Sequence, residues 1–269
     1  MSDYQALVAA ELDVPVDPQV TEMAQAIAAQ HGGASRAVLF YGSCLREKQL
    51  DGLMLDFYLI VSYYAAAYPK RWLATANRLI PPNVFPFAYN GLAAKYAVLS
   101  EADFAALTKR DASTVSVWAR FAQPTRLVWV ADDAARAAAV SAVAGSGPTL
   151  FSLAMPLVDG NDPVAIWRMG FAQTYRAELR AERTDRSGSI VDSDEARYRL
   201  FGQALLDDGV TGFADRAIAE RRWSQLQRSG KRASVARLAK ASLTFAGGID
   251  YLAWKINRHA GTQIEIKPW

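Results

Sequence analysis

The chain has 269 residues, enough for one large domain or two modest ones, and 51% of them are apolar, so a sizeable core is possible. Thirty Lys and Arg residues against 27 Asp and Glu residues leave a net charge of +3, which argues against a protein whose whole surface binds nucleic acid. Cys44 is the single cysteine, so an intramolecular disulfide is excluded and a reducing compartment is expected.

The first half of the chain alternates between short β-prone runs and helical periodicity. Residues 20–30 predict a helix that ends at a Gly-Gly pair. Further helices are expected over 68–79 and over 101–107, the second capped by Ser100. Pro86 restricts its strand to the edge of a sheet, because proline donates no ladder hydrogen bond. Strands are predicted over 36–41, 53–62, 84–90, 94–99 and 126–130.

After Asp132 helical periodicity dominates, with turns expected at 145–148 and 159–163 and a polar loop at 185–192. Ser229-Gly230 is expected to separate a basic C-terminal helix from the helices before it. The sequence therefore predicts an α+β fold in three parts: a domain with a mixed sheet over 1–135, a helical domain over 136–228 and a basic tail over 229–269.

The sharpest motif lies within residues 38–61, VLFYGSCLREKQLDGLMLDFYLIV. One strand delivers Gly42-Ser43 at its end, and a second strand carries Asp56 in an otherwise apolar run. Glycine lets backbone N–H groups approach phosphate oxygens, and a carboxylate is a hard ligand of the kind that Mg²⁺ prefers. An unpaired carboxylate in an apolar strand costs several kcal/mol, so Asp56 is expected to have either a metal ion or a structural Arg or Lys as its partner.

This order of turn and carboxylate resembles the nucleotidyltransferase superfamily, in which the turn holds a nucleoside triphosphate and strand carboxylates hold Mg²⁺. The superfamily usually has a second carboxylate two residues on, where this chain has Tyr58. Glu47 or Asp51 in the connecting loop, or a carboxylate from the helical domain, would have to complete the site.

Further segments are similar to the mitochondrial-type phosphatidate cytidylyltransferases, also called the translocator assembly and maintenance family. MLDF at 54–57 matches the family's Met-Leu-Asp-Phe strand, and KYAVLSEADF at 95–104 resembles its Lys-Tyr-Gly strand with the following turn and helix. VWARFAQPTRLVWV at 117–130, TYRAELRA at 174–181 and the basic segment 228–248 resemble later motifs of the family, in the family's order. The departures are Ala97 and Ala119 for Gly, Gln123 for Lys and Glu178 for Asp.

The resemblance implies a nucleotidyltransferase-type mixed sheet with helices, a mainly helical second domain and an enzyme that makes CDP-diacylglycerol and pyrophosphate from CTP and phosphatidate. It implies that Gly42 and Ser43 hold the triphosphate and that Lys95 contacts it. It also implies that Arg180 binds phosphate, and that Asp56 and Glu178 hold Mg²⁺, with Glu178 as a further candidate base. Without the resemblance, Lys95 reads equally as a solvated strand residue, and Glu178 and Arg180 as a surface pair on a helix.

From Arg216 to Arg258 there are ten Lys and Arg against two acidic residues, Glu220 and Asp250. This pattern suits an interfacial helix on an anionic membrane or an ordinary packed helix. The apolar residues that recur there at helical spacing are Val235, Leu238, Phe245, Ile249, Leu252 and Ile256. No transmembrane helix is expected, and the protein is placed in the cytoplasm, peripherally on the inner face of the membrane. The cations considered for this docking are Lys231, Arg232, Arg237, Lys240, Lys255 and Arg258.

Two other functions fit the same motif. A nucleotidyltransferase could act on tRNA, a protein or a small soluble molecule, although no nucleic acid partner is expected. A module that binds a nucleotide or lipid without catalysis would explain the single strand carboxylate.

Overall fold

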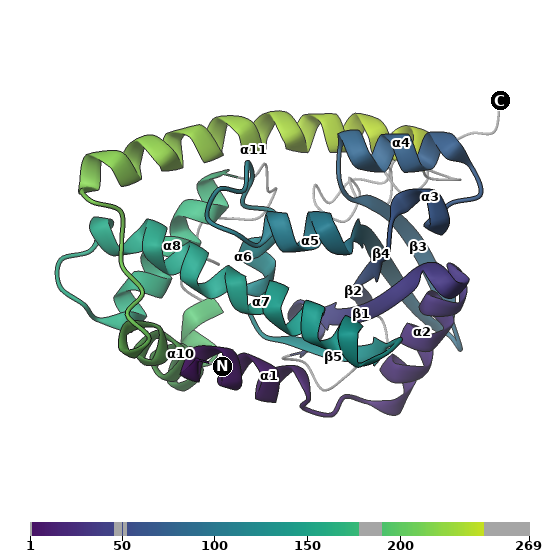
Figure 1. The fold of residues 1–269 in the computed structure, drawn as a ribbon, viewed down its shortest axis with the longest axis horizontal. Helices are drawn as coiled ribbons and strands as arrows, with labels where there is room; N and C mark the ends of the chain where they lie inside the picture. The colour runs from purple at the N-terminus through teal and green to yellow at the C-terminus, as the bar shows by residue number, and fades with distance from the viewer. Residues whose placement is uncertain (1, 46–49, 51–52, 178–189, 245–269) are drawn as a thin grey trace.

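The computed structural model describes residues 2–45, 50, 53–177 and 190–244. Its strands form one five-stranded sheet in the order β3-β4-β2-β1-β5 (Figure 1). The strands are β1 (Ser35–Tyr41), β2 (Met54–Val61), β3 (Asn83–Tyr89), β4 (Leu92–Ser100) and β5 (Thr125–Val130). The helices are α1 (Asp3–Leu12), α2 (Pro18–Ala29), α3 (Tyr64–Ala67), α4 (Arg71–Leu79), α5 (Glu101–Leu107), α6 (Trp118–Phe121), α7 (Asp133–Ala154), α8 (Pro163–Ala177), α10 (Glu195–Asp207) and α11 (Arg216–Thr244), with short 3₁₀ turns η1 (Gly32–Ala34), η2 (Ser43–Leu45) and η3 (Met155–Leu157).

The sheet is mixed. Strand β1 is antiparallel to β2 and to β5, and β3 is antiparallel to β4, whereas β2 and β4 are parallel. The parallel pair requires a crossover, which runs through α3, α4 and β3. Mixed sheet and following helices make the fold α+β with a mainly helical second part, as the sequence predicts.

Alternating side chains of the sheet enter two different cores. On β2, Leu55, Phe57 and Leu59 pack with α2, whereas Tyr58 and Ile60 face the core that the helical half shares. Asp56 has the same parity as Tyr58 and therefore lies on the face toward the helical half. The period-2 alternation of the strand thus decides which layer can reach the carboxylate.

All five predicted strands are confirmed with bounds within two residues of those expected. Strand β3 is an edge strand and Pro86 is exposed on it, as its lack of an N–H donor requires. Helix α5 begins at Ser100, whose hydroxyl accepts a hydrogen bond from the Asp103 N–H at 3.2 Å. Helix α1 was not foreseen; Ser2 caps it.

The turn expected at 145–148 is wrong, because α7 continues through it with Pro148 inside the helix. Helix α7 packs against α1, α5, α6 and α8, and this burial outweighs the ~3 kcal/mol that an interior proline costs. With η3 it forms one helical segment, residues 133–157, that is long and apolar enough to cross a membrane by length and composition alone. Of its apolar window 61% is buried inside the protein, which accounts for its composition.

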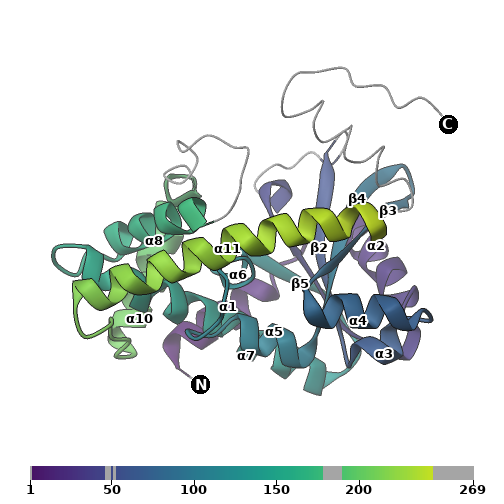
Figure 2. The same cartoon turned by 90° about the horizontal axis from the view of Figure 1, so that it is seen from above.

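The separation expected at Ser229-Gly230 is also wrong, since α11 is one helix from Arg216 to Thr244. Figures 1 and 2 show it running from the helical half to the β3 edge of the sheet. Gly230 is needed where α11 crosses the end of α8, because a Cβ there would lie 2.3 Å from the Ala177 carbonyl oxygen. Helix α11 therefore joins the expected helical domain to the expected tail; the division at 135 and 228 stays a prediction.

Candidate functional site

The turn after β1 depends on a glycine. Gly42 has a φ of +99°, in the region that favours glycine, and its carbonyl accepts a 3.3 Å hydrogen bond from the Leu45 N–H. A Cβ at position 42 would lie 3.3 Å from Asp56 Oδ2. The missing side chain therefore lets the turn close directly over the Asp56 carboxylate. The backbone of Ser43 begins η2, as the predicted turn requires.

Asp56 and Lys95 form the polar centre of the site. Asp56 is paired with Tyr41 across β1 and β2, and with Lys95 across β2 and β4. Lys95 Nζ lies 3.1 Å from Asp56 Oδ1, with 35% and 21% of the two side chains exposed. Oδ1 is itself buried and accepts no hydrogen bond of normal geometry, so the contact is an ion pair without a directed hydrogen bond. The structural partner considered for Asp56 from sequence is therefore present, and it is Lys95.

A cluster of aromatic rings lies next to the Asp56–Lys95 pair. The Tyr58 ring centroid is 5.3 Å from that of Tyr41 and 5.1 Å from that of Phe121. Tyr58 is 3% exposed, so the position where the superfamily has its second carboxylate is part of the apolar core. A carboxylate at that position would be buried among rings, which explains the aromatic residue physically.

Arg120, from α6, is a polar neighbour that the sequence reasoning did not single out. Burial, and after it the negative charge of Asp56, raise the pKa of Tyr41 well above its usual value, while the charge of Arg120 and its hydrogen bond act in the opposite direction. Arg120 also donates to the Ser116 carbonyl. Arg120 lies within the segment 117–130 that resembles the family, but nothing in its sequence spacing indicates that it reaches Tyr41.

Four of the candidate site residues lie outside the part of the chain that the structure describes. They are Glu178, Arg180, Glu47 and Asp51. In the part of the chain that the structure describes, no group of three or more His, Cys, Asp and Glu residues is arranged to hold a metal ion. Asp56 brings one hard-oxygen ligand, and the Lys95 ammonium lies against it. These residues do not by themselves form a magnesium site.

Two tail cations expected to face a membrane instead hold α11 to the connection between α4 and β3. Arg237 Nε donates to the Pro81 carbonyl and its Nη2 to Ser116 Oγ, both at 2.9 Å. Lys240 Nζ donates to the carbonyls of Pro82, at 2.8 Å, and Ile80. Lys240 is 8% exposed, and burial, with the nearby charge of Arg237, lowers its pKa to about 8.

The remaining tail cations divide into two groups. Lys231 and Arg232 are exposed, and Lys255 and Arg258 lie outside the described residues. Of the expected apolar positions, Val235 is 58% exposed. The positions Phe245, Ile249, Leu252 and Ile256 lie outside the described residues. Within the described part, α11 is thus a packed helix with a basic outer side.

Together, the fold and the site define an α+β protein with a mixed sheet, in which a glycine turn closes over an Asp–Lys ion pair. No family model matches the chain, and no curated protein matches it. Among solved structures, a nucleotidyltransferase-like protein from Exiguobacterium sibiricum is similar at a TM-score of 0.30 and 10% identity, covering 93% of this chain and 82% of that one. A likeness at this level carries no argument about function.

Proposed function

We propose that this chain is a nucleotidyltransferase that uses CTP to activate phosphatidate, giving CDP-diacylglycerol and pyrophosphate. One observation carries the nucleotidyltransferase part: the Gly42 turn closes over Asp56, and Lys95 from the neighbouring parallel strand pairs with it. These three residues come from separate segments of the chain, and the family resemblance assigns all three to a triphosphate site. CTP and phosphatidate follow from the resemblance to the mitochondrial-type cytidylyltransferases.

In the proposed reaction, a phosphate oxygen of phosphatidate attacks the α-phosphorus of CTP. A new P–O bond forms as the bond from the α-phosphorus to the bridging oxygen breaks, and the electron pair leaves with pyrophosphate. The turn at Gly42 offers backbone N–H groups to the phosphates, and Lys95 opposes the charge on the leaving group. The Lys95 side chain is 35% exposed, so its ammonium can stay partly hydrated while it exchanges the Asp56 carboxylate for a phosphate oxygen.

The proposal assigns Mg²⁺ to Asp56, with Glu178 as a second carboxylate and Arg180 as a phosphate ligand. When bound, such an ion neutralises charge between the phosphates. Asp56 would hold such an ion through its carboxylate, whose Oδ1 is buried and accepts no directed hydrogen bond. Lys95, which pairs with Asp56 in this structure, would then pair with a phosphate instead, since two cations at one oxygen repel each other.

A peripheral position on the inner face of the membrane also belongs to the proposal, because phosphatidate is held in a bilayer. The tail from Lys231 to Arg258 was expected to dock there. Cutting the chain at Ser229 would not test this cleanly, since it would divide α11 and remove the contacts of Arg237 and Lys240 to residues 80–82. A truncation after Thr244 keeps those contacts and is the better variant.

The test is incubation with radiolabelled CTP, Mg²⁺ and phosphatidate vesicles, followed by lipid extraction. We expect labelled lipid that requires phosphatidate, with pyrophosphate released in equal amount. CTP or dCTP should compete better than ATP or GTP. Turnover that needs no vesicles, or better use of ATP, would support a soluble or RNA acceptor instead.

A second candidate is a module that binds a nucleotide or lipid without catalysis. It is favoured by the single described carboxylate of the site, which already has Lys95 as a partner. Such a module would bind CTP but release no pyrophosphate. Measured pyrophosphate release above the Asp56→Asn background excludes it.

A further inference from the structure

Helix α4 exposes an unusual combination of side chains for a helix at the edge of a sheet. Trp72 is 49% exposed and Leu79 is 74% exposed, the highest value among the exposed large apolar residues that the structure describes. They lie on one face of the helix, because positions i, i+1, i+4, i+7 and i+8 point the same way. That face, here called the α4 face, consists of Arg71, Trp72, Thr75, Arg78 and Leu79, all exposed, with exposed Lys70 as the residue before the helix.

The opposite side of α4 is fixed to the sheet. Asn77 is completely buried, and its side-chain amide donates to the Val98 carbonyl of β4 at 2.9 Å. Its oxygen accepts from the Asn83 backbone N–H, and the Asn83 side chain donates to the Leu73 carbonyl at 3.0 Å. These hydrogen bonds give α4 a defined orientation, so Trp72 and Leu79 are held outward by the fold.

The chain segments that form α4 and the second half of α11 contain no acidic residue. No Asp or Glu occurs between Asp56 and Glu101, and none occurs between Glu220 and Asp250. The end of α4 adjoins the second half of α11, because Lys240 holds the carbonyls of residues 80 and 82 (Figure 2). A surface with exposed Trp and Leu, three cations and no carboxylate on its own element matches the chemistry of an anionic lipid interface.

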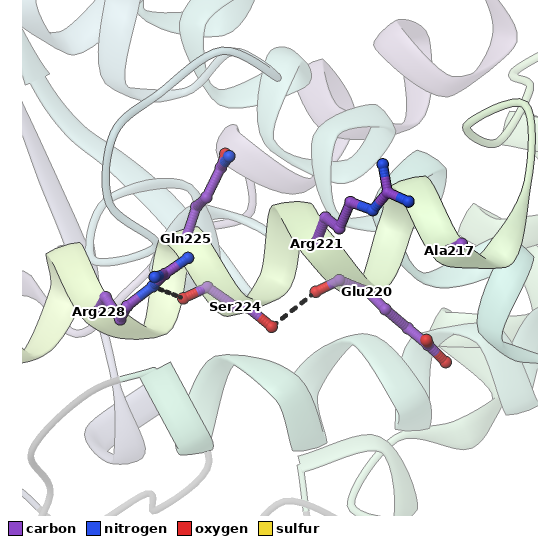
Figure 3. A pocket seen from close by; sticks show the side chains of 6 residues that line it. All are labelled: Ala217, Glu220, Arg221, Ser224, Gln225 and Arg228. Carbon is purple, nitrogen blue, oxygen red and sulfur yellow. Dashed lines mark hydrogen bonds between the residues drawn. The ribbon is translucent and has the colours of Figure 1, made fainter.

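The first half of α11 makes a useful contrast. The hollow there is lined by Ala217, Glu220, Arg221, Ser224, Gln225 and Arg228 (Figure 3). It is also basic, but it contains a carboxylate and no large apolar side chain that could enter hydrocarbon. Cations alone do not distinguish the α4 face from this hollow; the exposed Trp72 and Leu79 do.

We infer that the α4 face docks on an anionic lipid bilayer, with Trp72 and Leu79 in the interfacial layer and Lys70, Arg71 and Arg78 against lipid phosphates. Exposed Leu79 decides between a bilayer and a nucleic acid, since an aliphatic side chain gains free energy in hydrocarbon and has no partner on a phosphate backbone. The inference rests on the proposed function in one respect: a phosphatidate substrate gives the protein a reason to bind a bilayer. It moves the docking surface from the expected tail to the edge of the sheet.

The test is cosedimentation of the full chain with vesicles of phosphatidylcholine alone or with phosphatidylglycerol, without CTP or phosphatidate. Leu79→Ser is compared with Leu200→Ser, an exposed leucine of α10. A second comparison uses two double variants. The α4 variant combines Arg71→Gln with Arg78→Gln, and its control combines Arg221→Gln with Arg228→Gln, which removes the same charge from the α11 hollow. Thermal melting of each variant shows that it is folded, and Trp72→Gln replaces Leu79→Ser if that variant is not.

We expect the parent to bind anionic vesicles in preference to neutral ones. Each α4 variant should weaken that binding about tenfold, which corresponds to roughly 1.4 kcal/mol, while the matched controls stay within about twofold. The α4 arginine pair should also reduce the dependence on salt. Equal binding to neutral vesicles, or α4 variants that bind as the parent does, would overturn the inference. Pyrophosphate release is measured separately, so a failure here leaves the proposed reaction standing, and the reverse also holds.

Discussion

Lys95 and Asp56 are register partners on the parallel strands β4 and β2, with Lys95 Nζ 3.1 Å from Asp56 Oδ1. The pair lies where the Gly42 turn closes over the sheet. A half-exposed ion pair of this kind contributes only ~0.2–1 kcal/mol to stability. The pair therefore contributes little to the stability of the fold, and its importance lies in its position at the proposed triphosphate site.

Asp56→Asn should abolish turnover without unfolding the protein. The substitution keeps the shape of the side chain and removes the charge of a partly buried ion pair, so the loss of stability should stay near ~1 kcal/mol. Pyrophosphate release should fall by at least about 100-fold, as is common when electrostatic stabilisation of a transition state is removed. Activity and thermal melting are measured together, with Asp111→Asn, an exposed aspartate, as the control. Near-parent activity in a folded Asp56→Asn would contradict the assignment.

Lys95→Met should weaken nucleotide binding while the sheet stays intact. The half-exposed ammonium is the positive group closest to the Asp56 carboxylate in register, and its loss leaves triphosphate charge unopposed. We expect the Kd for CTP to rise about tenfold or more, which corresponds to roughly 1.4 kcal/mol. Titration calorimetry measures it, and Lys109→Met, at an exposed helix end, is the matched control. An unchanged Kd would mean that Lys95 serves only to neutralise Asp56.

Gly42→Ala tests the close approach of the turn to the carboxylate. Both Gly42, with φ +99°, and Gly91, with φ +79°, have backbone conformations that cost an alanine about 1–2 kcal/mol. A methyl group at Gly91 meets open space, whereas at Gly42 it lies 3.3 Å from Asp56 Oδ2. Both variants should therefore melt at lower temperature, but only Gly42→Ala should lose CTP binding. Equal CTP binding by the two folded variants would show that the turn does not approach the nucleotide.

Lys240 should make stability depend on pH in the alkaline range. Burial lowers its pKa from 10.5 to about 8 in the folded protein. Between these values the unfolded chain binds more protons than the folded chain, so the stability contributed by this group rises as pH increases from about 8 to 10.5. The melting temperature of the parent should therefore rise relative to that of Lys240→Met as the pH increases from 7 to 10. Parallel curves would contradict the burial of a charged amine.

The sequence alone determined the local features of the site. Gly42-Ser43 after an apolar run and Asp56 within another were recognisable because a turn glycine and a carboxylate in an apolar strand each have few physical explanations. Pro86 identified an edge strand and Ser100 a helix start for equally local reasons. Backbone geometry and the cost of burying charge act over a few residues, so these features can be read without the fold.

Only the tertiary structure decided which of these residues meet. The parallel register of β2 and β4 pairs Lys95 with Asp56 across 39 positions of sequence, which no pattern of spacing encodes. Helical propensity favoured breaks at Pro148 and at Ser229-Gly230, but packing of α7 and α11 along their lengths overrides such local costs. Arg237 and Lys240 looked like surface cations until α11 brought them to the carbonyls of residues 80–82. Long-range packing decides these outcomes because its free energy is summed over a whole element, whereas a sequence motif reports only its nearest neighbours.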